Sequence, residues 1–130
     1  MIIVGAKGHA EEVLQLFTQL NAEDDLYFFD NMSKDLPLLF HKKFRIVKSL
    51  EEAEAILMKD KRFVLGIGNP QTRHKLAMML TKAGGKLQSI ISPLAAIGKY
   101  EVSLGEGLNV MTNVIIYNNT NRNYIFICTN

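Results

Sequence analysis

The segment from Gly5 to Glu12 combines glycines, a lysine and a histidine at a spacing that could contact an anion. It reads Gly-Ala-Lys-Gly-His-Ala-Glu-Glu and lies between an apolar run and an amphipathic stretch. Gly5 permits a tight turn and Gly8 lets the main chain approach a phosphate oxygen, while free N–H groups at a helix start favour an anion. The spacing Gly-x-x-Gly-x-Ala differs from the dinucleotide pattern Gly-x-Gly-x-x-Gly, so a tight turn with nothing bound is the alternative.

Two side chains of this loop are candidate ligand contacts. His9, at the helix start, could donate to a phosphate or a sugar hydroxyl, or could simply face solvent. Lys7, at the tip of the loop, could pair with a phosphate or be a solvated charge. Glu11 and Glu12 complement the helix dipole.

A carboxylate follows the second apolar run. Asp30 comes 25 residues after Gly5, at the carboxyl end of the expected strand 26–29, and Asn31 follows it. A carboxylate at this place can accept hydrogen bonds from a ribose or a base. The alternative is an Asx-type turn residue.

A second glycine loop, Gly66-Ile67-Gly68-Asn69, also lies between an expected strand and an expected helix. Ligands of open α/β sheets bind outside the carboxyl ends of the strands, so two such loops predict one shared crevice. Arg73, in the first turn after the loop, either faces that crevice or is a surface charge. His74 is expected at the surface and His41 in an ordinary loop.

The elements that must position these loops alternate along residues 1–92. Apolar runs predict strands, and apolar residues at helical spacing predict helices between them. Ser49 with Glu52 forms a capping box, Asn69 with Pro70 a helix start, and Gly84-Gly85 a helix end. The order predicts a Rossmann-like α/β fold, a parallel sheet with flanking helices, with strands expected at 2–4, 26–29, 44–47, 63–67 and 87–91.

After Pro93, apolar residues recur at every sixth position instead of at helical spacing. Such repeats wind a parallel β-helix with one aliphatic side chain of each short face pointing inward. Residues 93–130 are therefore expected to form an incomplete hexapeptide-repeat β-helix, although Arg122 interrupts one row. The two rows are Leu104, Val110, Ile116, Arg122 and Cys128, and Leu108, Val114, Thr120 and Phe126.

Composition excludes several classes of function. The chain of 130 residues is 48% apolar with a net charge of +2 and no basic block, which disfavours nucleic-acid binding. One cysteine, Cys128, allows no internal disulfide and favours a cytoplasmic location. No run is long and apolar enough to span a bilayer, the start leaves no room for a signal peptide, and we predict no metal site.

Taken in order, these motifs resemble the bacterial sugar O-/N-acyltransferases of the sialic acid O-acetyltransferase and UDP-4-amino-sugar N-acetyltransferase type. The resemblance covers nearly the whole chain. It rests on the segments Gly5-Ala6-Lys7-Gly8-His9-Ala10, Phe29-Asp30-Asn31, Gly66-Ile67-Gly68-Asn69 with Arg73, and Ile91-Ser92-Pro93 leading into the repeats.

The resemblance implies an N-terminal domain that binds a nucleotide-sugar acceptor, a UDP- or CMP-sugar. It also implies a left-handed β-helix that forms homotrimers and binds acetyl-CoA, the co-substrate, between subunits. Gly8 and His9 would belong to the nucleotide-sugar loop, Asp30 and Asn31 would meet the nucleoside, and Gly68 and Asn69 would line the same pocket.

This chain differs from the family pattern at the catalytic centre. The family's catalytic histidine follows an Asn-Thr-Gly-like stretch in the β-helix, and this chain reaches only Cys128-Thr129-Asn130. We therefore expect the base beyond Asn130, no acetyl-CoA bound to this chain, and a polypeptide that binds its acceptor without catalysing.

Two other functions stay open on sequence grounds. The opening strand-loop-helix unit with Asp30 at the ribose position is compatible with a non-catalytic dinucleotide- or nucleotide-sensing module. The segment 94–130 is compatible with a plain assembly domain that trimerises.

Overall fold

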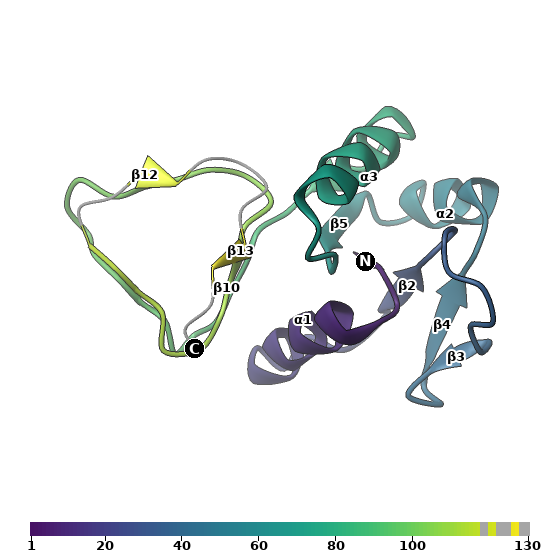
Figure 1. Cartoon of the computed structure of the whole chain (residues 1–130), viewed down its shortest axis with the longest axis horizontal. Helices are drawn as coiled ribbons and strands as arrows, with labels where there is room; N and C mark the ends of the chain where they lie inside the picture. Colours follow the sequence, from purple (N-terminus) through teal and green to yellow (C-terminus); the bar gives the residue numbers. More distant parts are fainter. Residues whose placement is uncertain (118–119, 122–125, 128–130) are drawn as a thin grey trace.

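The computed structural model describes residues 1–117, 120–121 and 126–127. A six-stranded sheet flanked by three helices is followed by a triangular coil that lies to one side of it (Figure 1). The helices are α1 Gly8–Gln19, α2 Leu50–Leu57 and α3 Pro70–Lys82. The strands of the sheet are β1 Ile2–Val4, β2 Tyr27–Phe29, β3 Leu39–Phe40, β4 Phe44–Val47, β5 Arg62–Leu65 and β6 Lys86–Leu87.

The sheet runs in the order β3-β4-β2-β1-β5-β6, and every pair is parallel except the β3–β4 hairpin. The chain adds strands on one side of β1, then crosses to β5 on the other side. The order of strands therefore reverses between β1 and β5, and this is where open α/β sheets bind ligands. The mixed α/β architecture confirms the predicted fold class.

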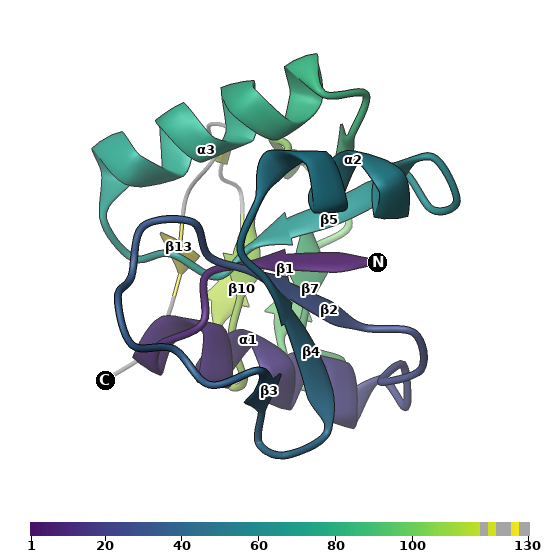
Figure 2. The same cartoon turned by 90° about the vertical axis from the view of Figure 1, so that its right-hand side faces the viewer.

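Side chains of the central strands alternate between the two faces of the sheet, and each face has its own apolar core. Ile3, Phe28 and Val64 pack with α1 on one face. Val4 and Leu65 pack with α2 and α3 on the other. Figure 2 shows α1 on one side of the strands and α2 and α3 on the other.

The predicted helix boundaries are confirmed. The Ser49 hydroxyl accepts from Glu52 N at 3.3 Å, and the Asn69 side chain accepts from Thr72 N at 2.9 Å. The chain leaves α3 through Gly84, whose φ of +92° suits glycine. These caps fix where α2 and α3 begin, and so fix the loops that precede them.

Two predictions about strands were wrong. The expected strands include none between residues 29 and 44, yet β3 pairs with β4 through a turn at His41 and Lys42, both with positive φ. The single strand predicted over 87–91 is split, because β6 ends the sheet and Ile90–Ile91 forms β7, which pairs with the coil. A short apolar run does not reveal that its two ends join different sheets.

The coil consists of three small parallel ladders that form the sides of a triangle (Figure 1). Ile90 pairs with Asn109 and Asn109 with Phe126, so the first turn of chain takes 19 residues and the next 17. Leu108, Val110, Val114 and Ile116 fill its interior. The predicted inward residues Arg122 and Cys128 lie outside the described residues. The strands of the coil are β7 Ile90–Ile91, β8 Ala96–Ile97, β9 Ser103–Leu104, β10 Asn109–Val110, β11 Ile115–Ile116, β12 Thr120–Asn121 and β13 Phe126–Ile127.

Among the described helices, none combines the length and the apolar character that crossing a bilayer requires.

Candidate functional site

The two predicted glycine loops lie against each other at the carboxyl ends of β1 and β5. Gly66 N donates to Val4 O at 2.7 Å, and Gly5 N donates to Phe29 O at 2.7 Å. A Cβ on Gly5 would lie 2.6 Å from Gly66 O, and one on Gly66 would lie 2.9 Å from Val4 O. These two glycines therefore let the loops pack together, and their amides are bonded within the protein.

Gly8 and Gly68 have different surroundings. A Cβ placed on either would meet no atom within 4 Å, and neither glycine has a positive φ. Both are exposed. Neither backbone conformation nor packing within the described residues requires glycine at these two positions, which leaves their main chain open to approach from outside.

Helix α1 begins at this open edge without a side-chain cap. Its N-cap residue is Lys7, which is exposed and whose side chain makes no capping hydrogen bond. Ala10 N is bonded to Lys7 O at 2.7 Å. In α2 and α3, by contrast, Ser49 and Asn69 cap the first turn. The start of α1 is thus the helix end in this region that a ligand can complement.

Asp30 forms the Asx-type turn that was the alternative to a ligand contact. Its Oδ1 accepts from Met32 N at 3.0 Å and from Ser33 N at 2.8 Å, which orders the segment after β2. The carboxylate is nonetheless beside a cavity of about 160 Å³ at the end of the sheet. The cavity is lined by Gly5, Phe29, Asp30, Asn31, Met32, Ser33, Ile67, Thr72 and Leu76.

His9 does not present its ring to the mouth of the loop. Its Nδ1 bonds Glu12 Oε2 at 2.9 Å, and its Nε2 lies 3.3 Å from Asn109 Nδ2 in the coil. Burial lowers the pKa of His9, opposed by the Glu12 carboxylate and aided by the Arg73 charge. The described contacts therefore direct the imidazole toward the coil, and the expected donation to a phosphate or sugar finds no support in them.

Arg73 is buried beneath the second loop, with 1% of its surface exposed, so it is not a surface charge. Its Nη1 donates to Leu65 O at 3.1 Å and to Ile67 O at 2.7 Å, and its Nη2 donates to Gly107 O at 3.0 Å. Burial lowers the pKa of Arg73 to about 10, so the guanidinium keeps its charge at neutral pH. It supports the shape of the loop from within.

The structure brings most of the predicted residues to one edge of the sheet. Gly8, Lys7, Gly68 and Asn69 are exposed at the loops, and Asp30 and Asn31 border the adjoining cavity. Sequence reasoning missed other neighbours of the site, Met32, Ser33 and Thr72, and missed Asn109. Asn109 is a polar residue between Leu108 and Val110 in an apolar run, which is the one signal that could have found it.

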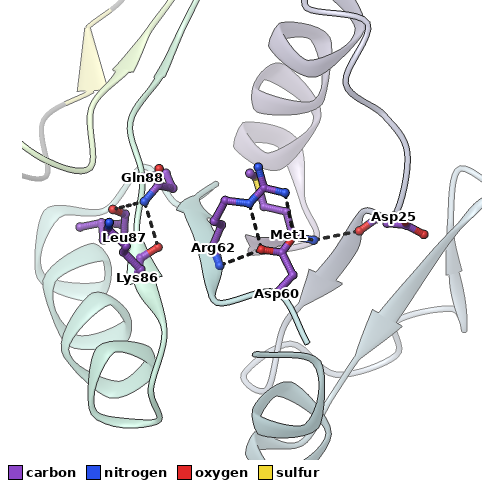
Figure 3. A network of polar contacts seen from close by, with 7 residues as sticks. All are labelled: Met1, Asp25, Asp60, Arg62, Lys86, Leu87 and Gln88. Atoms are coloured by element: carbon purple, nitrogen blue, oxygen red, sulfur yellow. Dashed lines mark hydrogen bonds and ion pairs between the residues drawn. The ribbon is translucent and has the colours of Figure 1, made fainter. Parts of the chain in front are cut away.

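Another, larger cavity lies among the described residues at the opposite end of the sheet. This open pocket has a volume of about 650 Å³ and lies at the amino ends of the strands, between Met1, Tyr27, Arg45 and Asp60. Figure 3 shows Asp60 at the centre of this region, bonded to Arg62 and to the Met1 ammonium. Ligands of open α/β sheets bind at the carboxyl ends instead. We therefore place the candidate site at the glycine loops despite their smaller cavity.

Within the described residues, no group of three His, Cys, Asp or Glu side chains could hold a metal ion.

Solved structures of several bacterial proteins share this architecture. PerB from Caulobacter crescentus, crystallised with CoA and GDP-perosamine, is 26% identical with a TM-score of 0.79. The acetyltransferase domain of PglB from Neisseria gonorrhoeae, with acetyl coenzyme A, is 19% identical with a TM-score of 0.80. WeeI from Acinetobacter baumannii is 21% identical with a TM-score of 0.74.

The matches cover nearly all of this chain and part of each neighbour. PerB and PglB are matched over 98% of this chain but only 59% and 60% of their own, and WeeI over 96% and 58%. A comparison with curated proteins found no match.

A family model gives the remaining finding. The model of the PglD N-terminal domain matches residues 1–80, which include both glycine loops, Asp30 and Arg73. This match covers more than half of the chain, so the protein belongs to the PglD N-terminal domain family.

Proposed function

We propose that this chain is the acceptor-binding portion of an acetyl-CoA-dependent sugar O-/N-acetyltransferase, and that its glycine loops bind a nucleotide-sugar. The observation that carries the proposal is the pair Gly8 and Gly68. Both are glycines that the protein's own packing does not need, and both lie where the strand order reverses. A diphosphate at this edge would meet the uncapped start of α1, and the nucleoside would extend toward Asp30 and Asn31.

The chemistry of the site fits binding better than catalysis. Acyl transfer needs a base within hydrogen-bond reach of the attacking hydroxyl or amine. The ring nitrogens of His9 are engaged by Glu12 and Asn109, and His41 pairs with Glu11 at the surface. We propose that this chain supplies the acceptor-binding site and that neither His9 nor His41 acts as the base of the transfer.

The remaining assignments are proposals of the same kind. The turns of 19 and 17 residues, with three strands in each, support a left-handed hexapeptide β-helix of about six residues a side. We assign residues 1–92 to the nucleotide-sugar domain and 93–130 to the β-helix. β7, Ile90–Ile91, pairs with β10 of the coil and thus lies just before this proposed boundary. The full-length protein is proposed to be a cytoplasmic homotrimer. Sedimentation would test the oligomeric state.

Isothermal titration of the chain with GDP-, UDP- and CMP-sugars tests the proposal. A neighbour of this chain was crystallised with GDP-perosamine, so the guanine nucleotide joins the uridine and cytidine ones expected from sequence. Saturable binding that is weakened at least tenfold by Gly68→Val, but not by Gly84→Ala, supports the site. Absence of measurable heat with all three classes contradicts it. Fluorescence enhancement of NADH without binding of any nucleotide-sugar would favour a dinucleotide-sensing module instead.

A further inference from the structure

The described residues include three sets of hydrogen bonds that connect the coil to the α/β domain. Arg73 reaches Gly107, Asn109 reaches Leu65 and His9, and Gln19 reaches Ser92 and Thr112. The first two sets touch the glycine loops. The third lies at the other end of α1, about 15 Å away by the rise of a helix over ten residues.

The Arg73 guanidinium is bonded to both sides of the junction at once. Its Nη1 is bonded to the carbonyls of Leu65 and Ile67, which flank Gly66, while its Nη2 is bonded to Gly107 in the coil. The guanidinium is planar and rigid, so displacement of the loop carbonyls must be accompanied by displacement of the Gly107 contact or by loss of a bond. Its buried charge also lies beneath the loop that is proposed to hold a diphosphate.

Asn109 forms the second link and is fully buried. Its Nδ2 donates to Leu65 O at 2.5 Å and lies 3.3 Å from His9 Nε2. A carbonyl oxygen can only accept a hydrogen bond, so the atom of Asn109 that contacts Leu65 O must be the amide nitrogen. The same nitrogen then donates to His9 Nε2, which must therefore be unprotonated. Among the residues that the structure describes, Asn109 Oδ1 is buried with no hydrogen-bond partner. Such an orphaned acceptor costs stability, so the residue is not explained by packing alone.

We propose that Arg73 and Asn109 are positioning residues that couple the Gly66–Asn69 loop to the β10 side of the coil, so that an anionic ligand on the loop orders residues 107–110. The inference rests on the proposed function for the ligand but not for the linkage itself. Arg73 and Asn109 both donate to the carbonyl of Leu65, the last residue of β5 before the loop, so a ligand that orders the loop restrains both donors. In a full-length acyltransferase this would align the acceptor with the coil.

Hydrogen exchange of the full chain, with and without GDP, UDP and CMP as probes, tests the coupling. The variants are Arg73→Lys, which keeps the charge but loses the fork, and Asn109→Ala. The control is Gln19→Ala, which breaks a junction contact away from the loops. We expect a bound nucleotide to slow exchange of residues 107–110 several-fold in the natural chain and in Gln19→Ala, and less than twofold in the other two variants.

The ligand-free proteins separate the inference from the proposed function. Without nucleotide, Arg73→Lys and Asn109→Ala should speed exchange in residues 66–69 and 107–110 together, and Gln19→Ala in neither. If no nucleotide binds the natural chain but this paired change occurs, the proposed function fails and the coupling stands. If nucleotide binds and the natural chain shows no slowing at 107–110, or if Gln19→Ala abolishes it equally, the coupling is wrong. That comparison holds even if the Asn109 variant does not fold.

Discussion

Glycines in this site differ in what surrounds them, and the difference separates packing from binding. Gly66 lies between Val4 O and the Ala10 backbone, which would both be within about 3 Å of an added Cβ. Gly68, two residues later, would meet nothing within 4 Å. One glycine is explained by the protein's own contacts, and the other by what binds there in our proposal.

Substitution of these two glycines by alanine should therefore change stability to different extents. Gly66→Ala forces two backbone segments apart and should lower the free energy of unfolding by roughly 1 to 3 kcal/mol. Gly68→Ala should change it by less than about 0.5 kcal/mol. Urea denaturation of both variants measures the difference. Equal loss of stability in the two would show that Gly68 also serves packing.

The protonation state of His9 should influence stability. Its pKa is lowered in the folded protein, chiefly by burial and also by Arg73, against the opposing effect of Glu12. The folded chain thus prefers the neutral ring, so the stabilisation is complete above the unfolded value near 6.5 and is lost as pH falls through the folded pKa.

The measurement is the urea midpoint at pH 7.5 and at pH 5. The natural chain should lose more stability between the two values than His9→Gln, which cannot titrate there and retains His41 and His74 as background. Nitrogen chemical shifts of the imidazole should report a proton on Nδ1 and none on Nε2 at pH 7.5. A proton on Nε2 would contradict the Asn109 contact.

At the scale of elements, the three helices begin in different ways. α2 and α3 have side-chain caps, whereas α1 begins at Lys7 without one. The caps of α2 and α3 serve stability, but Asn69 also borders the proposed site. The pair Ser49 and Asn69 therefore allows the two roles to be separated.

Ser49→Ala and Asn69→Ala should each lower the free energy of unfolding by about 1 kcal/mol, since each removes one N-cap acceptor. Only Asn69→Ala should also weaken binding of a nucleotide-sugar. Denaturation and titration of the two variants under one set of conditions provide the check. Equal affinity in both variants would remove Asn69 from the ligand site and leave it as a cap.

At the scale of the molecule, the sheet and the coil have separate cores joined by a polar junction. Leu108 is fully buried inside the coil, and Leu94 on the same coil is 61% exposed. The Arg73, Asn109 and Gln19 contacts connect the two parts. Loss of packing in the coil should therefore lower the free energy of unfolding of the whole chain.

Leu108→Ala should lower the free energy of unfolding by about 2 to 5 kcal/mol because it leaves a cavity in the coil. Leu94→Ala should change it by less than about 0.5 kcal/mol. Calorimetry of both variants is the test. A coil transition separate from that of the sheet in Leu108→Ala would show that the junction does not join the parts cooperatively.

Local sequence determined much of the fold and of the site. Strand-forming runs, the caps at Ser49 and Asn69 and the glycines at helix ends act over a few residues, so they can be read without knowing the partner segment. The same holds for both glycine loops, because the strand-to-helix order of an α/β fold fixes the end of the sheet at which they lie. That is why Gly8, Gly68 and Asp30 can be named as candidates for the site from the sequence.

Only the tertiary structure decided what each of these residues contacts. Arg73 was expected either in a crevice or at the surface, and it is buried among carbonyls from Leu65, Ile67 and Gly107. His9 was expected at a ligand and it contacts Asn109, 100 residues away along the chain. The division of residues 87–91 between two sheets depends equally on distant partners. Such contacts join segments whose separation leaves no local pattern, so they arise only when the coil packs against the sheet.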